Sequence, residues 1–94
     1  MLNIRYYIDP VTDEFHIYEH GVYEDEIEDV LNRPIEDYAG RNDSRVAIGQ
    51  TLGGRYLRVI YVPDEVPNSV FVVTAYELSG KALTAFRRRQ RKRR

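Results

Sequence analysis

Cysteine is absent from this chain of 94 residues. Its absence excludes disulfides, thiol catalysis and metal sites built on cysteine. The sequence also lacks an apolar run long enough to cross a membrane. Its first ten residues do not show the basic-then-apolar pattern of a signal peptide, and Asp9 and Pro10 interrupt them. We therefore expect a cytoplasmic protein with no membrane partner.

Basic residues are scarce over most of the chain and crowded at its end. Residues 1–80 contain all 15 acids and only six arginines, which leaves a formal charge of −9. Residues 81–94 contain eight basic residues and no acid, so their formal charge is +8. The last nine residues read FRRRQRKRR. This asymmetry favours an anionic partner for the tail, although the tail could also dock on an acidic protein, fold back on its own acidic body or simply be solvated.

The length and the composition predict one globular domain that spans residues 1–94, with a basic tail at 86–94. Residues 24–33 are expected to form an acidic helix, because Ile27, Val30 and Leu31 make one apolar stripe and Pro34 ends it. Val22 and Ile27 have the spacing of a hydrophobic staple around an N-cap at Tyr23. A basic C-terminal helix is expected from about Ser79, and residues 15–21 fit either a strand or a helix.

Strands are expected at residues 3–8, 45–51, 55–62 and 69–76, where β-branched and aromatic residues gather. The short glycine-containing loop after residue 51 predicts a hairpin, and the next polar loop extends it to a three-stranded meander. The predicted fold class is therefore α+β, with an antiparallel sheet made of the N-terminal strand and the meander, packed with the two helices.

A family resemblance rests on the order of these elements and on several short motifs. The segment HGV is followed by the acidic helix, by RVAIGQT and GRYLRVIYV, and then by VFVVTAYEL and the basic tail. This order resembles the BrnT-like toxins, which belong to the RelE-like group of small bacterial ribonuclease toxins. The resemblance implies an antiparallel sheet packed with helices, a toxin of a toxin–antitoxin pair that cleaves RNA, and an antitoxin protein as its partner.

Two positions depart from that resemblance. Where BrnT-like proteins tend to carry Ser-Ala-Arg, at the end of the last long strand, this chain has Thr74, Ala75 and Tyr76. Where a tyrosine is common in their last helix, it has Phe86. These departures keep open a second hypothesis, in which the chain is a catalytically inactive RNA-binding or protein-interaction module on the same fold.

The candidate site follows from the needs of metal-independent RNA cleavage. A base must take the proton of the 2′-hydroxyl, an acid must protonate the leaving oxygen, and cations must offset the charge of the phosphorane. His20, in the motif HGV, suits proton transfer, while a structural role at the entry to the acidic helix is its alternative. Tyr76 can donate to a phosphate. The candidate catalytic residues are His20, Arg45, Arg55, Arg58 and Tyr76.

The remaining candidates are cations expected to contact RNA phosphates without regard to sequence. They are Arg41, Arg87, Arg88, Arg89, Arg91, Lys92, Arg93 and Arg94. For Arg58, within a strand, the alternative is a salt bridge across the sheet. His16 and His20 could offer two nitrogens to a metal, with oxygens from Glu19 or Glu24. Because no third, distant histidine completes a zinc set, we expect neither a metal nor a cofactor.

Overall fold

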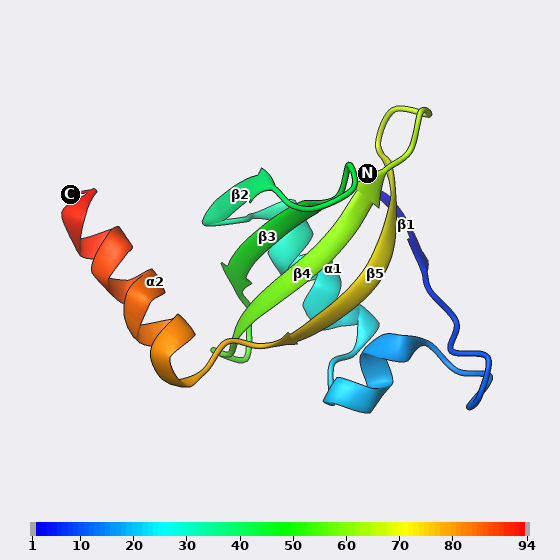
Figure 1. Cartoon of the computed structure of the whole chain (residues 1–94), viewed down its shortest axis with the longest axis horizontal. Helices are drawn as coiled ribbons and strands as arrows, with labels where there is room; N and C mark the ends of the chain where they lie inside the picture. Colours follow the sequence, from blue (N-terminus) through cyan, green and yellow to red (C-terminus); the bar gives the residue numbers. More distant parts are fainter. Residues whose placement is uncertain (1, 94) are drawn as a thin grey trace.

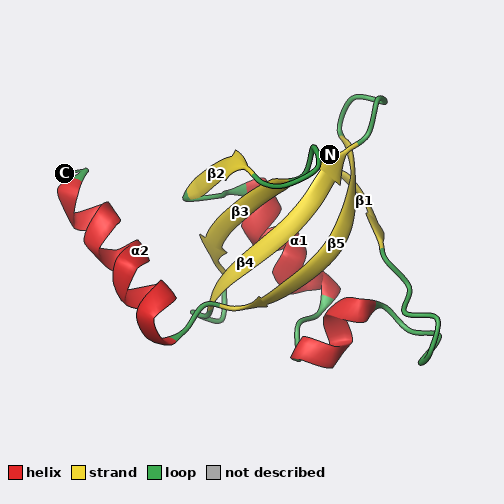
Figure 2. Ribbon diagram, viewed as in Figure 1, coloured by secondary structure: helices red, strands yellow, loops and turns green. Residues whose placement is uncertain are grey.

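The computed structural model describes residues 2–93, and Arg94 of the predicted tail lies outside them. Its elements follow the chain in an α+β order (Figures 1 and 2). They are β1 (Asn3–Tyr6), the 3₁₀ helix η1 (His16–His20), α1 (Glu24–Asn32), β2 (Glu36–Ala39), β3 (Arg45–Gln50), β4 (Tyr56–Pro63), β5 (Ser69–Glu77) and α2 (Gly80–Lys92). The predicted fold class, α+β, is confirmed.

The five strands form one sheet in the order β1-β5-β4-β3-β2. The predicted meander is confirmed, since β3 pairs antiparallel with β4 and β4 pairs antiparallel with β5. The expectation of a purely antiparallel sheet is wrong, because β1 pairs parallel with β5. The chain leaves β1, passes through η1 and α1, and builds the rest of the sheet before β5 arrives beside β1 in the same direction (Figure 1).

Short and polar segments account for the other differences from the sequence prediction. The sequence reading did not include β2, whose four residues EDYA are mostly exposed. The first strand ends at Tyr6, two residues earlier than expected, although Ile8 still forms a single bridge with Phe15. The ambiguous segment at 15–21 is the helix η1, which ends at Gly21 in the left-handed region with φ of 67°. Only glycine adopts this conformation without a steric cost.

The main core lies between the sheet and the two helices α1 and η1. Helix α1 packs against β3 and β4, and η1 packs against β5. Ile27 and Val30 of α1 are fully buried, as is Val22, so both residues of the expected staple lie in this core. Tyr23 is the N-cap, and its backbone N–H donates to the Glu26 carboxylate at 3.1 Å. The apolar stripe therefore places α1 across one face of the sheet (Figure 2).

Close contact between α1 and β3 depends on a glycine. A Cβ atom at Gly49 would lie 3.2 Å from a side-chain carbon of Val30 and 3.4 Å from its Cα. The 3.2 Å contact is tighter than most contacts of a packed interior, so the Val30 side chain would have to shift. The missing side chain at Gly49 thus lets the helix axis approach the sheet.

The opposite face of the sheet is only partly covered. Phe86 of α2 is 2% exposed and forms a second, smaller core with Val46 and Ile48 of β3 and with Leu78. Helix α2 lies beside the β2 edge of the sheet and does not lie over the face of β4 and β5 (Figure 2). We call that uncovered area the open face; its half-buried residues are Arg58, Ile60, Val62, Phe71, Thr74 and Tyr76.

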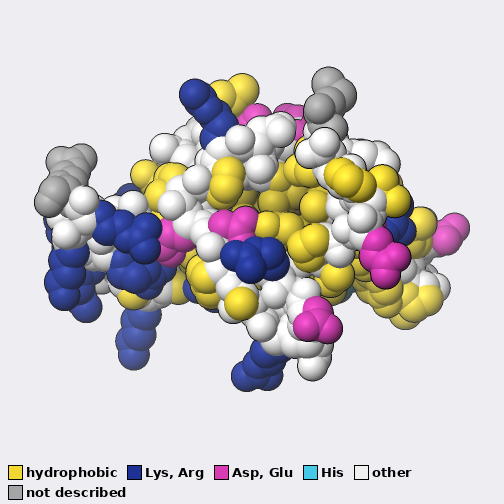
Figure 3. All heavy atoms as spheres, turned by 90° about the horizontal axis from the view of Figure 1, so that it is seen from above, with side chains coloured by type: hydrophobic (Ala, Val, Ile, Leu, Met, Phe, Trp, Pro, Cys, Tyr) yellow, Lys and Arg dark blue, Asp and Glu magenta, His cyan; other side chains and the backbone are white. Residues whose placement is uncertain are grey.

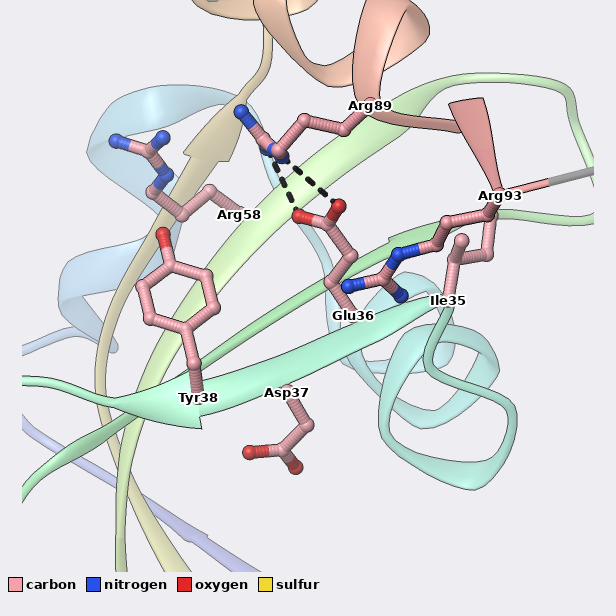
Figure 4. A pocket seen from close by; sticks show the side chains of 7 residues that line it. All are labelled: Ile35, Glu36, Asp37, Tyr38, Arg58, Arg89 and Arg93. Atoms are coloured by element: carbon pink, nitrogen blue, oxygen red, sulfur yellow. Dashed lines mark hydrogen bonds and ion pairs between the residues drawn. The ribbon is translucent and has the colours of Figure 1, made fainter. Parts of the chain in front are cut away.

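An ion pair between the half-exposed Arg89 and a buried carboxylate, Glu36, fixes α2 to the edge of the sheet. Glu36 on β2 is 7% exposed and accepts two hydrogen bonds from Arg89, at 2.9 and 2.8 Å, and a third from Gln90 at 2.8 Å (Figure 4). The paired guanidinium of Arg89 lowers the pKa of Glu36, and the positive charge of Arg93 lowers it further. A charge that leaves water must be paired, so this carboxylate determines where the basic helix docks.

The first prediction concerns the main core. Replacing Ile27 with alanine should lower the free energy of unfolding by about 2–5 kcal/mol, because it removes a fully buried side chain and leaves a cavity. The matched control, Val66→Ala, alters an exposed side chain and should change it by less than about 0.5 kcal/mol. Urea denaturation followed by circular dichroism measures both. Equal midpoints for the two variants would contradict the position of α1.

The second prediction concerns Glu36. The variant Glu36→Gln should unfold more easily at pH 7 by about 1–3 kcal/mol, since it loses charged hydrogen bonds. The folded-state pKa is lowered, so the stabilisation by Glu36 is fully present above about 4.5, the ordinary value, and is lost as the pH falls through the folded pKa. The difference between wild type and variant should therefore shrink only in acid. A difference that is constant from pH 7 to pH 3 would refute the charged pair. Glu65→Gln, at an exposed position, serves as the control.

Candidate functional site

Three of the predicted catalytic residues meet at the edge of the open face. Arg58 on β4 and Tyr76 on β5 are cross-strand partners. The Arg58 guanidinium donates to the Tyr76 hydroxyl at 3.4 Å, and its central carbon lies 6.0 Å from the centroid of that ring. The ring of His20, at the end of η1, lies 6.0 Å from the Tyr76 ring, centroid to centroid. An imidazole, a phenol and a guanidinium thus lie next to one another in space, with the phenol in the middle.

Local structure explains why these side chains converge. Side chains alternate along a strand, so Arg58 faces away from α1 while its neighbours Leu57 and Val59 are buried beneath that helix. Tyr76 shares its face because it pairs with Arg58. Helix η1 packs against β5, and its last residue, His20, is exposed beside Tyr76. The site is therefore built from two strands and one helix end.

Arg58 carries a positive charge that no carboxylate neutralises within residues 2–93, where the ion pairs involve other groups. The salt bridge across the sheet, which was the alternative for this residue, is not formed. Its Nε atom and the Thr74 hydroxyl are also buried with no hydrogen-bond partner in the described chain. Unsatisfied buried polar atoms are uncommon and costly. Arg58 and Thr74 therefore have hydrogen-bonding capacity that the described chain does not use.

A shallow pocket of about 430 Å³ adjoins Arg58. Figure 4 shows the arginines 58, 89 and 93 around it, with Tyr38 beside Arg58 and the carboxylate of Asp37 turned away. Glu36 pairs with Arg89, as described above. Three guanidinium groups and one buried carboxylate leave a net positive lining, which suits an anionic group such as a phosphate.

Arg45 lies on the opposite face of the sheet from Arg58. Its Nε atom donates to the Asp37 carboxylate at 2.7 Å, and Asp37 also accepts the hydroxyl of Tyr61. Burial, followed by the hydrogen bond to Asp37, raises the pKa of Tyr61 to about 12. The carboxylate likewise raises the pKa of Arg45. Arg45, Asp37 and Tyr61 thus bond to one another on the α1 side of the sheet. The structure does not bring Arg45 to His20.

Arg55 is also held by other elements and does not join the cluster. Its guanidinium donates to both carboxylate oxygens of Glu26, at 2.9 and 2.8 Å, to Glu77 at 3.2 Å and to the carbonyl of Gly21 at 2.9 Å. It thus ties the start of α1 and the end of η1 to the β3–β4 hairpin. Of the five predicted catalytic residues, the structure brings together His20, Arg58 and Tyr76.

The predicted phosphate contacts lie at two places. Arg41 is exposed in the turn between β2 and β3. The tail residues belong to α2, where Lys and Arg side chains gather at one end of the molecule (Figure 3). Arg89 is used to dock the helix, and Arg87 lies over the Tyr56 ring at 5.9 Å. Four further cations are exposed and pair with no carboxylate of the described chain: Arg88, Arg91, Lys92 and Arg93.

Sequence reasoning missed Glu36, which forms both the pocket wall and the docking point of α2. The segment around it is short and acidic, and nothing in it distinguishes one carboxylate that will be buried from its exposed neighbour Asp37. The sequence offered one signal, the positive charge of the tail beside an acidic body. It predicted that the tail could fold back on the body, but it did not indicate which acid the tail would contact.

Of three comparisons with known proteins, one identifies a domain family. Among residues 2–93, no helix has the length and apolar character needed to span a membrane. No curated protein and no solved structure matches the chain. A family model described as a domain of unknown function, DUF4258, matches residues 15–77, about two thirds of the chain, from η1 to the end of β5. The match includes all five predicted catalytic residues and excludes α2, and it shows that the chain belongs to the DUF4258 family.

Proposed function

We propose that this protein is a cytoplasmic endoribonuclease, the toxin of a toxin–antitoxin pair, whose site is the cluster of His20, Tyr76 and Arg58. The observation that carries the proposal is the meeting of these three side chains beside an open face, with an arginine that has no carboxylate partner within residues 2–93. The resemblance to BrnT-like toxins supports the same activity and supplies the expected partner, an antitoxin protein.

The cluster offers each group that cleavage without a metal requires. His20 takes the proton of the 2′-hydroxyl, whose oxygen attacks the adjacent phosphorus. Arg58 stabilises the added negative charge on the phosphorane, and its position in a partly buried strand strengthens this effect. Tyr76, whose hydroxyl accepts a hydrogen bond from Arg58, protonates the leaving 5′-oxygen. The P–O5′ bond breaks, and the products are a 2′,3′-cyclic phosphate and a 5′-hydroxyl.

The surroundings of the cluster suit a single strand of RNA. Unpaired bases stack on aromatic side chains, and Phe71 and Tyr76 are half-buried on the open face. Arg5 lies 5.2 Å from the centroid of the Phe71 ring. At the other end, the exposed cations of α2 can follow the phosphate backbone. The proposed RNA path therefore runs across the open face from Phe71 to α2.

A second candidate function is a non-catalytic module that binds RNA or a protein on the same fold. It is favoured by the internal ion pairs of Arg45 and Arg55, which leave one of three candidate strand arginines for a ligand. The sequence Thr74-Ala75-Tyr76, in place of Ser-Ala-Arg, favours it as well. The two candidates differ in whether RNA is cut.

The third prediction tests this difference. Purified wild type should cleave single-stranded RNA to 2′,3′-cyclic phosphate ends, detected by mass spectrometry. The variant His20→Asn should lower kcat by about 10²–10⁴-fold, because the proton acceptor is lost, and Arg58→Gln by about 10²–10³-fold. Arg33→Gln, at an exposed position directly after α1, should retain wild-type kcat.

Circular dichroism must show that each variant is folded. Full cleavage by folded His20→Asn would exclude that residue as the base. Wild type that binds RNA without cutting it would support the binding module instead.

The fourth prediction concerns α2. Replacing Arg88, Arg91 and Lys92 together with glutamine should weaken RNA binding similarly for all sequences, because backbone charge carries no base identity. The slope of log affinity against log salt should fall by about 2, since each phosphate contact on a single strand contributes about 0.7. The control variant, Arg88→Lys with Arg91→Lys and Lys92→Arg, keeps the three positive charges and should keep the slope. An unchanged slope in the glutamine variant would show that these residues do not contact phosphates.

A further inference from the structure

Three ligand-type side chains converge beside η1, at a place that the proposed cleavage site does not use. The Nδ1 atom of His16 lies 3.3 Å from an oxygen of Asp9 and 3.2 Å from an oxygen of Glu19. One ligand atom from each of the three residues lies within 4.8 Å of the other two. Asp9 and His16 are largely shielded, with side chains 15% and 27% exposed, while Glu19 is 43% exposed.

The backbone fixes this arrangement in two ways. Residues 9–14 form a tight loop, closed by backbone hydrogen bonds from Asp9 to Glu14 at 2.8 Å and from His16 to Tyr7 at 2.9 Å. The loop brings Asp9 against the start of η1. In a 3₁₀ helix, side chains three residues apart are eclipsed, so His16 and Glu19 share one face. The three groups therefore come together without a long flexible connection.

The hydrogen bonds within this cluster cannot satisfy both carboxylates. One ring nitrogen carries at most one proton, yet two carboxylate oxygens face it at nearly equal distances. Only the contact with Asp9 has hydrogen-bond geometry, and at 3.3 Å it is long. The backbone N–H of Val11 donates to Oδ1 of Asp9 at 2.8 Å, which leaves the other oxygen of Asp9 toward the imidazole. No arginine or lysine among residues 2–93 pairs with Asp9 or Glu19, so both carboxylates depend on the single ring nitrogen of His16 for a cationic partner.

A divalent cation bound between the three side chains satisfies both carboxylates and the ring nitrogen at once. Bonds of about 2.0–2.2 Å to nitrogen and oxygen place neighbouring ligand atoms roughly 3–3.5 Å apart, close to the two measured contacts. An imidazole ligand favours a first-row transition metal over Mg²⁺ or Ca²⁺, which prefer sets made of oxygen alone.

We propose that Asp9, His16 and Glu19 bind one Zn²⁺ ion, through Oδ2, Nδ1 and Oε2, with water in the remaining coordination positions. The set differs from the His16 and His20 pair considered from the sequence. Its role is to position a neighbour: the His20 ring packs edge-on against that of His16, with centroids 5.3 Å apart. Bound metal would hold η1 in the geometry that presents His20 to Tyr76. Binding of Zn²⁺ does not depend on the proposed function, whereas the role of positioning His20 rests on it.

The test uses tag-free, chelator-treated full-length protein, titrated with ZnCl₂ in a calorimeter. Wild type should bind one equivalent, and a hundredfold excess of Mg²⁺ should not displace it. The near-isosteric variants Asp9→Asn and Glu19→Gln, as well as His16→Asn, should each weaken binding at least tenfold. Two matched controls should bind as wild type does: Glu14→Gln, an exposed acid of the same loop, and His20→Asn.

Thermal unfolding provides a second readout. Zn²⁺ should raise the Tm of wild type and of both controls, because a ligand that binds only the folded state stabilises it. It should leave the Tm of Asp9→Asn nearly unchanged. Wild type that binds no Zn²⁺ would overturn the proposal. Binding that survives in Asp9→Asn and Glu19→Gln but disappears in His20→Asn would also overturn it, since the metal would then lie on the histidine pair.

Discussion

The ion pair between Glu36 and Arg89 is the interaction on which the arrangement of the molecule depends. It places a buried carboxylate on a short edge strand and satisfies it with a guanidinium and an amide from the C-terminal helix. A carboxylate so shielded has to be paired. Helix α2 is therefore held at the edge of the sheet, with Phe86 as its apolar anchor, and the face of β4 and β5 stays uncovered.

The pairing of charges also explains which arginines are available for a ligand. The body of the chain, residues 1–80, is strongly acidic, and three of its six arginines have a carboxylate partner. Arg45 pairs with Asp37, and Arg55 pairs with Glu26 and Glu77. Arg58 points to the open face, where within residues 2–93 no acid pairs with it; it donates to a phenol and lines a pocket with two further arginines. Because the protein places a cation where it provides no counter-charge of its own, an anionic ligand is the chemistry that this surface fits best.

Much of the fold could be predicted because its longer elements carry strong periodic signals. The stripe of Ile27, Val30 and Leu31 predicts α1, and runs of β-branched residues predict the meander. The parallel partner of β1 could not be predicted, because alternation within a strand does not encode its direction relative to a distant strand. The strand β2 has four mostly exposed residues and carries no hydrophobic alternation. Likewise, the sequence nominates His20, Arg58 and Tyr76 separately, and only the strand register and the position of η1 show that they meet. The strand register also places Arg45 and Arg58 on opposite faces of the sheet. Residue type could not predict this, because both are arginines in strands.

The central claim is that the open face, together with His20 and α2, is the RNA-binding surface. An NMR titration with a short 2′-O-methylated oligoribonucleotide tests it most directly, because such a strand lacks the attacking hydroxyl and stays intact. The account predicts that resonances of Arg58, Phe71, Tyr76, His20 and the exposed end of α2 shift, while those of Asp37, Arg45 and Tyr61 on the other face do not. Shifts that centre on Arg45 or Arg55, or saturable binding that leaves Arg58 and Tyr76 unchanged, would contradict it.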